Sequence, residues 1–266
     1  MKNAIITGGT HQDFEAMATL VINILDVMPD LDADIVIFHD GISKEEQQAL
    51  CAIWPVRFIK YKAPICFWQM LLNPNIRYFS SVIFCKYEAL RLLSEYDHVM
   101  WTDYDVVIKE DISNLFSLCK GATFVTNGNS KLKDMFFPQK LPGIEKKLAE
   151  KYELEKDAIT TPLFVFSKSI GDYMQYYDWC NTATNRYYRL LSLPEQAVFS
   201  MMLQKFNIPY DELSNEIYAL HPKYDKGKAK IVHAYGQPKF WNGYEDKSWN
   251  EYNQKWQECR RKAAEK

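Results

Sequence analysis

The sequence has 266 residues and a mass of 31.2 kDa, which fits one large domain or a domain with a small addition. Hydrophobic residues make up 47% and charged residues 25%, a balance that excludes a disordered chain. The net charge of −2 lacks the basic surplus typical of nucleic-acid-binding proteins, so we expect no nucleic-acid partner.

Short apolar strands alternate with helices through the first hundred residues. Residues 3–7 form a β-branched run that ends at Gly8-Gly9, and Thr10 with Asp13 predicts a capped helix start. Apolar spacing then predicts helices at 14–28, from Ser43 and at 81–95, and strands at 34–38, 56–60 and 99–101. This alternation is typical of an α/β protein with a mostly parallel sheet covered by helices.

The second half continues the pattern around an irregular stretch. Residues 127–157 are rich in Lys, Gly and Pro, which indicates an excursion from the core. Strands are expected at 106–108, 163–166 and 231–232, and helices at 169–190 and 195–206. No internal repeat or low-complexity linker divides the chain, so we expect a single main domain over residues 1–243.

Residues 244–266 form a basic, aromatic C-terminal tail. Six basic and three acidic residues give positions 247–266 a net charge of +3, and Trp249, Tyr252 and Trp256 stand at helical spacing. Two interpretations are open: a helix that lies on an anionic membrane surface, and a terminal helix that packs its tryptophans on the domain.

The cellular location follows from what the chain lacks. No window approaches the roughly 20 apolar residues that cross a bilayer, and the start, MKNAIITGGT, is too short for a secretory signal core. The six cysteines are scattered without a Cys-x-x-Cys pair, as in free thiols of a reducing compartment. We therefore predict a cytoplasmic protein, with peripheral attachment to the inner face of the membrane as the location that the first tail interpretation implies.

The strongest chemical signal is Asp103-Tyr104-Asp105, directly after an apolar strand. In an extended backbone residues i and i+2 point the same way, so both carboxylates face one spot at the sheet edge where α/β proteins bind ligands. Two converging carboxylates suit Mg²⁺ or Mn²⁺. For the motif alone, a solvated acidic loop is the alternative.

With its context, this stretch resembles glycosyltransferase family 8, the retaining nucleotide-sugar transferases of the GT-A fold. Residues 96–108 are similar to that family's strand and D-x-D motif, Glu195-Gln196 to its acid–Gln pair, and residues 233–241 (HAYGQPKFW) to its closing H-x-x-G-x-x-K-x-W element. The similarity covers residues 3–241. It implies a single-domain, Rossmann-like GT-A fold with a mixed, mostly parallel sheet flanked by helices.

The resemblance also implies the roles of the central site residues. Asp103, Asp105 and His233 would bind one divalent cation, Mn²⁺ with Mg²⁺ as the alternative, because an imidazole ligand shifts the preference toward Mn²⁺. Gln196 would lie beneath the sugar, near the anomeric carbon, and complete the catalytic set with the two aspartates. The resemblance also implies that Tyr104, Gly236 and Lys239 bind the donor, with Gly236 and Lys239 at its diphosphate.

Several expected donor contacts depart from the family pattern. Thr7-Gly8-Gly9-Thr10 stands where the family often has an acidic or Asn-bearing loop for base and ribose, and Thr160-Thr161 with Pro162 replaces its N-x-G on the sugar side. An Arg expected two residues after Tyr87 is absent, and Arg77 or Lys86 is its candidate replacement. Glu195 has two interpretations, a substrate contact or one half of a capping box with Ser192.

These features predict a metal-dependent retaining glycosyltransferase. It would move a hexose from a nucleotide diphosphate sugar, a UDP-sugar first of all, to a hydroxyl of a glycan or glycolipid acceptor such as a lipopolysaccharide or capsule intermediate. A catalytically idle nucleotide-sugar-binding protein is the alternative that the altered residues 160–162 motivate. A metal-dependent phosphohydrolase is a third possibility, but the sequence lacks the extra acids and histidines that a two-metal site needs. The P-loop, serine-hydrolase and zincin motifs are also absent from the sequence.

Overall fold

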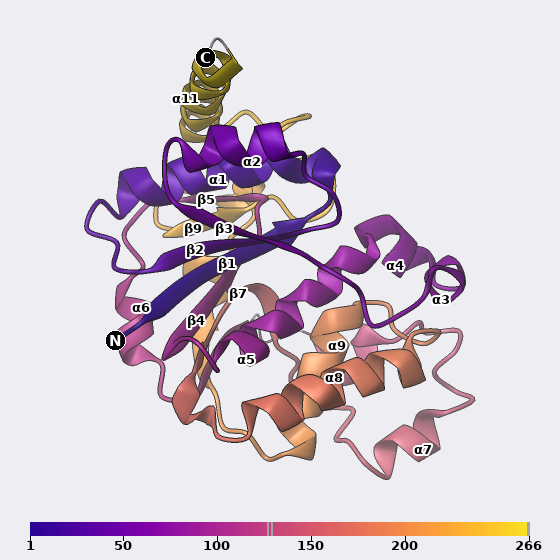
Figure 1. The fold of residues 1–266 in the computed structure, drawn as a ribbon. Coiled ribbons are helices and arrows are strands. Elements are labelled where there is room, and N and C mark those ends of the chain that lie inside the picture. Colours follow the sequence, from indigo (N-terminus) through magenta and orange to yellow (C-terminus); the bar gives the residue numbers. More distant parts are fainter. Residues whose placement is uncertain (127, 129, 265–266) are drawn as a thin grey trace.

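A seven-stranded sheet forms the centre of the computed structural model, which describes residues 1–126, 128 and 130–264 (Figure 1). The strand order is β3-β2-β1-β4-β7-β6-β8. The strands are β1 (Asn3–Gly9), β2 (Asp34–His39), β3 (Val56–Lys60), β4 (His98–Thr102), β6 (Ala122–Thr126), β7 (Thr160–Ser167) and β8 (Asp211–Ser214). Only β7 runs antiparallel to its neighbours in this sheet, which confirms the predicted mixed, mostly parallel arrangement.

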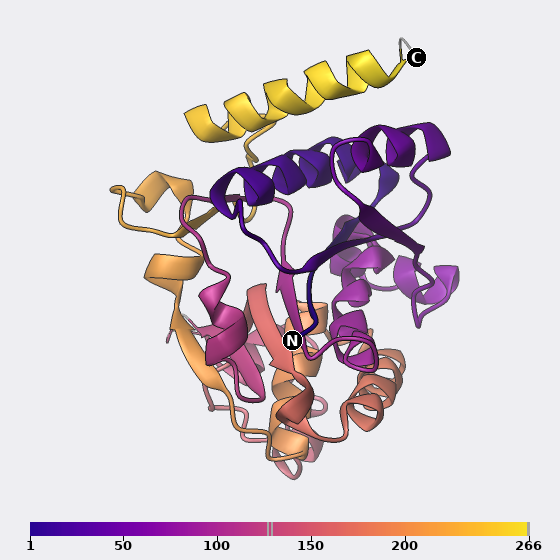
Figure 2. The same cartoon turned by 60° about the vertical axis from the view of Figure 1, so that its left-hand side comes forward.

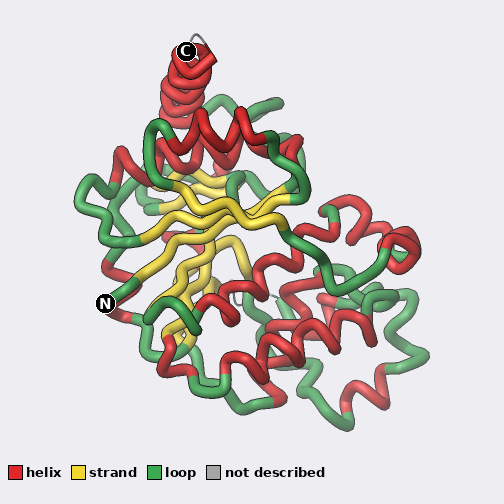
Figure 3. The backbone as a smooth tube through the Cα atoms, viewed as in Figure 1, coloured by secondary structure: helices red, strands yellow, loops and turns green. Residues whose placement is uncertain are grey.

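Helices cover both faces of the sheet (Figure 3). Successive residues of β1 point to opposite faces, so Ile5 belongs to one hydrophobic core and Ile6 to the other. The helices that contribute to the first core are α1 (Phe14–Val27), α2 (Lys44–Cys51), α6 (Asn114–Leu118) and α11 (Lys247–Ala264). Those that contribute to the second are α4 (Pro74–Phe79), α5 (Glu88–Leu92), α7 (Glu145–Ala149), α8 (Tyr173–Tyr187) and α9 (Pro194–Lys205).

A small antiparallel sheet stands beside the main one and carries part of the candidate site. It pairs β5 (Val106–Ile108) with β9 (Ile231–His233). The buried Asn23 side chain of α1 holds β5 in place: it donates to the Ile108 carbonyl at 2.8 Å and accepts from the Ile108 N–H at 2.7 Å. The remaining elements are α3 (Phe67–Leu71), α10 (Asn215–Tyr218) and the 3₁₀ turns η1 (His11–Asp13), η2 (Ser81–Tyr87), η3 (Leu132–Met135), η4 (Lys168–Ile170) and η5 (Pro222–Tyr224).

The helix predicted over residues 81–95 differs from the observed structure. The chain forms the 3₁₀ turn η2 and only then the short α5, and Ser80 begins the turn with a positive φ of 66°. Phe84, Cys85, Lys86 and Tyr87 of this turn are all buried, and the buried run continues through Leu90 in α5. The segment is therefore covered on all sides, and Lys86 lies in the interior.

The tail forms α11, which lies along α1 as the outermost layer (Figure 2). Its aromatic face is turned inward: Trp256 is fully buried with its ring 5.5 Å from that of Phe14, and Trp249 is buried against Phe240. Tyr252 donates a 3.2 Å hydrogen bond to Asp26 of α1. The packing interpretation of the tail is therefore correct for the described residues, and these aromatic side chains cannot enter a membrane. Residues 265–266 of the predicted tail lie outside the described part.

Two predictions from the composition agree with the structure. All six cysteines are free, three of them buried. Across the part of the chain that the structure describes, no helix combines the length and the apolar character needed to cross a bilayer.

Candidate functional site

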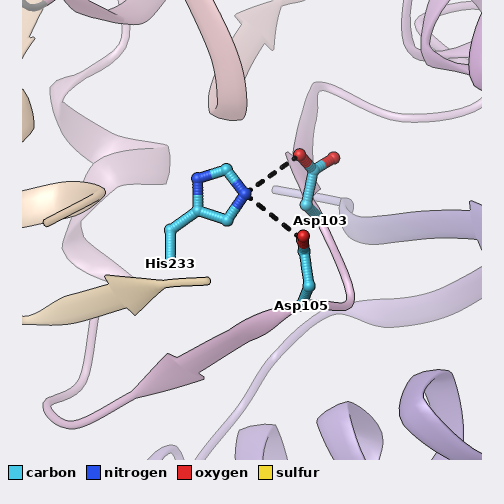
Figure 4. A group of neighbouring side chains, drawn as sticks. All are labelled: Asp103, Asp105 and His233. Atoms are coloured by element: carbon cyan, nitrogen blue, oxygen red, sulfur yellow. Dashed lines mark ion pairs between the residues drawn. The ribbon is translucent and has the colours of Figure 1, made fainter. Parts of the chain in front are cut away.

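Three side chains converge where the two sheets meet (Figure 4). Asp103 and Asp105 lie between β4 and β5, and His233 ends β9. The antiparallel register pairs Val106 with His233, and the Ala234 N–H donates to the Asp105 carbonyl at 2.9 Å, so the imidazole is drawn to the aspartates. The His233 Nε2 atom lies 3.3 Å from Asp105 Oδ1 and 3.8 Å from Asp103 Oδ2.

The two aspartates converge as predicted, but the backbone conformation that brings them together is not the one expected. Residues 103–105 are not extended, because β4 ends at Thr102 and β5 begins only at Val106. The Asp103 N–H instead donates to the Pro162 carbonyl of β7 at 2.8 Å. The bend, rather than strand alternation, presents both carboxylates to His233.

Each of the two carboxylates is paired with its own lysine through one oxygen, and its other oxygen faces the imidazole of His233. Asp103 Oδ1 lies 2.9 Å from Lys86 Nζ and accepts from the Trp101 indole at 2.7 Å, while Asp105 Oδ2 is paired with Lys239. The inward atoms, Asp103 Oδ2, Asp105 Oδ1 and His233 Nε2, belong to a group whose ligand atoms all lie within 4.8 Å of one another. Two carboxylate oxygens and one imidazole nitrogen fit a divalent cation.

Burial and neighbouring charges separate the two aspartates. Burial raises the pKa of Asp103 above its usual value and outweighs the attraction of Lys86. For Asp105, burial also acts to raise the pKa, but His233 and Lys239 outweigh it and hold the pKa well below its usual range. The neighbouring His233 and Lys239 therefore favour the ionised form of Asp105.

Lys86 links the aspartates to a second group of predicted site residues. Its buried ammonium lies 3.2 Å from Glu195 Oε1 and donates to the Thr161 carbonyl at 3.0 Å and to Thr161 Oγ1 at 3.2 Å. Thr161 Oγ1 in turn donates to Glu195 Oε1 at 2.8 Å. Burial acts to lower the pKa of Lys86, but Asp103 and Glu195 outweigh it, and the pKa is raised. This one ammonium is thus the shared cation of two carboxylates, Asp103 and Glu195.

The capping-box interpretation of Glu195 is wrong. The residue before α9 is Leu193, whose side chain makes no capping hydrogen bond, and the Ser192 carbonyl accepts from the Asn75 amide at 2.6 Å. Glu195 turns inward to Lys86 because its buried carboxylate finds a cation there. Its neighbour Gln196 is half-buried, and its Oε1 accepts from the Thr161 N–H at 3.3 Å.

The loop after β9 closes over the aspartates. Gly236 has a φ of +74°, which favours glycine, and a Cβ there would meet no atom within 4 Å. Lys239, expected at the diphosphate, donates to the Ala234 carbonyl at 2.8 Å as well as pairing with Asp105. Trp241 stacks on Tyr104 with ring centres 6.1 Å apart.

Arg77 and Thr160 stand further from the cluster. Arg77 is exposed on α4, next to Tyr78, whose hydroxyl accepts a 3.4 Å hydrogen bond from Gln237 of the loop after β9. Thr160 uses its hydroxyl to donate to the Val125 carbonyl at 3.0 Å. Of the two candidates for the missing arginine charge, Lys86 is therefore the one that contacts the cluster, at Asp103.

The end of β1 is packed against protein rather than open. A Cβ on Gly8 would meet Cys85 Sγ at 2.5 Å, and one on Gly9 would meet Tyr104 at 2.9 Å. Close packing against these protein neighbours explains why glycine stands at both positions, and no bound ligand is needed to explain it. Thr7 is buried, and its hydroxyl has no hydrogen-bond partner among the residues described.

One carboxylate at this end of β1, that of Asp13, was not among the predicted site residues. Asp13 Oδ2 accepts from the Thr10 N–H at 2.9 Å and from Thr10 Oγ1 at 2.6 Å, and it would lie 3.3 Å from a Cβ on Gly9. The Thr10–Asp13 spacing indicated the cap but not that the same carboxylate borders the site. Residues 7–10 themselves hold no acid, as the sequence shows, and the nearby Asp13 carboxylate is engaged by Thr10.

A known protein family matches most of the chain. The family model for Glycosyl transferase family 8 matches residues 5–245. Among curated proteins, the comparison found no significant sequence match.

Solved structures give the fold. The galactosyltransferase LgtC, in complex with donor and acceptor sugar analogs, is 15% identical, with a TM-score of 0.62 over 98% of this chain and 96% of its own. GlyE of Streptococcus pneumoniae is 14% identical, with a TM-score of 0.63 over 98% of this chain and 63% of its own. The bifunctional glycosyltransferase WbbM is 13% identical, with a TM-score of 0.65 over 94% of this chain and 49% of its own. At these identities the likeness establishes the fold, which is of the GT-A type.

Proposed function

The chain belongs to glycosyl transferase family 8 and is a glycosyltransferase; on that premise we propose that it is a metal-dependent, retaining enzyme. It transfers a hexose from a nucleotide diphosphate sugar, a UDP-sugar first of all, to a hydroxyl of a glycan or glycolipid. The observation that carries the proposal is the buried group of Asp103, Asp105 and His233, with one lysine behind each carboxylate.

The metal-binding part of the proposal rests on the orientation of these side chains. Lys86 and Lys239 hold the outer carboxylate oxygens, so the inner oxygens and His233 Nε2 are aimed at one point before any ligand arrives. The imidazole favours Mn²⁺ over Mg²⁺, which prefers all-oxygen sites. A divalent cation held by Asp103, Asp105 and His233 would supply positive charge to the departing diphosphate. Lys239 adds a second positive charge at the same edge.

The route of transfer follows from the lack of a suitable nucleophile on the sugar side. Glu195 is the carboxylate beside Gln196, but it is buried and its Oε1 is taken up by Lys86 and Thr161. We therefore assign a front-face reaction. The bond from the anomeric carbon to the phosphate oxygen breaks, the acceptor oxygen bonds to the same face, and its proton passes to the leaving diphosphate. Gln196 positions the sugar beneath this exchange.

An idle nucleotide-sugar-binding protein is the second candidate, favoured by the sugar-side residues. The Thr161 hydroxyl is used for Glu195 and that of Thr160 for Val125, so neither is turned to a sugar. The backbone N–H of Thr161 is also engaged, by Gln196. Donor turnover separates this candidate from the enzyme.

The test is donor turnover without acceptor. The protein is incubated with Mn²⁺ and a panel of UDP-, GDP- and CDP-sugars, and the released sugar is followed by proton NMR before its anomers equilibrate. We expect slow release from one donor with its anomeric configuration retained, and loss of release in Asp105→Asn. Binding without release would favour the idle protein, and neither binding nor release with any donor would contradict both.

A further inference from the structure

The helices α3 and α4 carry a cluster of exposed apolar side chains. Among the described residues twelve large apolar side chains are exposed, and six of them lie between Phe67 and Phe79. Phe67 is 61% exposed and Trp68 73% exposed, with ring centres 5.7 Å apart. The other four members of this α3–α4 patch are Leu71, Leu72, Tyr78 and Phe79. Soluble proteins seldom gather apolar side chains in this way except where they bind a partner or a membrane.

Hydrogen bonds hold the segment that carries the patch in a fixed conformation. Asn73, between the two helices, is fully buried; its Oδ1 accepts from the N–H groups of Asn75 and Ile76 at the start of α4. Its amide nitrogen donates to the carbonyls of Tyr188 and Leu191. The exposed rings are thus presented on an anchored turn at the edge of the molecule, away from the layer of α1, α2 and α11 (Figure 1).

The segment of the chain that contains the patch is basic. No acidic residue occurs between Glu46 and Glu88. The same span holds five basic residues, of which Arg57, Lys60, Lys62 and Arg77 are exposed, and Arg57 is paired with Glu95.

The end of α8 adds to this charge. Asn185 donates to the Pro64 carbonyl at 2.7 Å and accepts from Gln69 at 3.2 Å, which holds the exposed Arg186 and Arg189 beside the same segment. The apolar patch therefore has a basic rim.

We propose that the α3–α4 patch binds an anionic lipid bilayer. The rings of Phe67 and Trp68 and the neighbouring leucines enter the headgroup region, while the basic rim faces the anionic headgroups. A protein partner fits less well, because lysine is depleted at protein interfaces. The tail does not serve this purpose, since its tryptophans are buried in the domain.

The position of the patch has a consequence that rests on the proposed function. Tyr78 belongs to the patch and its hydroxyl accepts from Gln237, in the loop that carries Lys239. The bilayer would thus lie beside the candidate site, and a glycolipid acceptor anchored in it would reach the site without leaving the membrane.

Vesicle sedimentation with the full chain tests the proposal. Vesicles of phosphatidylcholine alone and mixed with phosphatidylglycerol are used, without donor or metal. We expect binding to the mixed vesicles only, reduced at least ~10-fold by Phe67→Ser with Trp68→Ser, since two rings no longer leave water. The matched control, Leu118→Ser with Met174→Ser, removes two exposed apolar side chains elsewhere and should bind like the wild type.

The basic rim has its own test in the same assay. Lys60→Gln and Lys62→Gln should each weaken binding about 5-fold at low salt, and the exposed control pair Lys226→Gln and Lys228→Gln should not. All four lysines are exposed, so melting temperatures should stay unchanged.

Two results would overturn the proposal. The first is no binding of the wild type to anionic vesicles, which includes the case in which the chain self-associates through the patch instead. The second is equal vesicle binding by the wild type and by the variant that lacks Phe67 and Trp68. Donor release is measured separately in solution, so failure of membrane binding leaves the proposed function standing, and the reverse also holds.

Discussion

Replacing Lys86 by methionine tests how the candidate site is held together. The Lys86 side chain is only 6% exposed, and its Nζ lies 2.9 Å from Asp103 Oδ1 and 3.2 Å from Glu195 Oε1. Methionine fills a similar volume but leaves two carboxylates without their shared cation. Removing one partner of a buried ion pair costs about 3–5 kcal/mol in the free energy of unfolding. For a chain of this size that lowers the melting temperature by roughly 6–20 °C.

Urea denaturation of a double-mutant cycle measures this loss. In Lys86→Met with Glu195→Gln only Asp103 remains uncompensated, so we expect the second substitution to restore about 1–2 kcal/mol to the first. Lys228→Met, at an exposed lysine, is the control and should stay within about 0.5 kcal/mol of the wild type. A Lys86→Met protein as stable as the wild type, or a cycle whose two losses simply add, would refute the reasoning.

Three further predictions concern the surroundings of the site. Trp256→Ala should lower the free energy of unfolding in urea by about 3–5 kcal/mol, because the ring is fully buried; an unchanged midpoint would place the tail outside the core. Gly236→Ala should cost about 1–2 kcal/mol in the same assay through its positive φ, and Gly236→Asn, which tolerates that conformation, should recover part of it. Burial lowers the pKa of His39 below 6.5 in the folded protein, so unfolded chains take up protons first and stability should fall as the pH drops below 6.5. His39→Gln keeps an acceptor for the Ile42 N–H and should flatten that fall between pH 7 and pH 5; an equally steep fall would exclude His39 as its source.

The cluster of Asp103, Asp105 and His233 was predictable because its signals are local. D-x-D after an apolar strand, and His233 with Gly236 and Lys239 at short spacing, can each be recognised without knowledge of the fold. The link between Lys86 and Glu195 was not, because the two lie 109 residues apart. The sequence around Glu195 also matched a capping box, and nothing local distinguishes that cap from a buried ion pair.

The strands were predicted better than their directions. Apolar runs such as residues 163–166 show that a strand is buried, but not that β7 runs antiparallel to β4. Two strands, β6 and β8, were missed. The exposed sequence of β8, Asp-Glu-Leu-Ser, lacks an apolar face and pairs with β6 only at the edge of the sheet. The 3₁₀ winding of residues 81–87 likewise depends on tertiary contacts rather than on helix propensity.

The central claim is that Asp103, Asp105 and His233 hold one divalent cation on which a nucleoside diphosphate binds. Calorimetric titration of UDP into the protein, in Mn²⁺ and in chelator, tests it most directly. We predict binding at least ~10-fold tighter in Mn²⁺ for the wild type, and no such gain for Asp105→Asn. Equal UDP affinity with and without Mn²⁺, or an undiminished gain in Asp105→Asn, would contradict the claim.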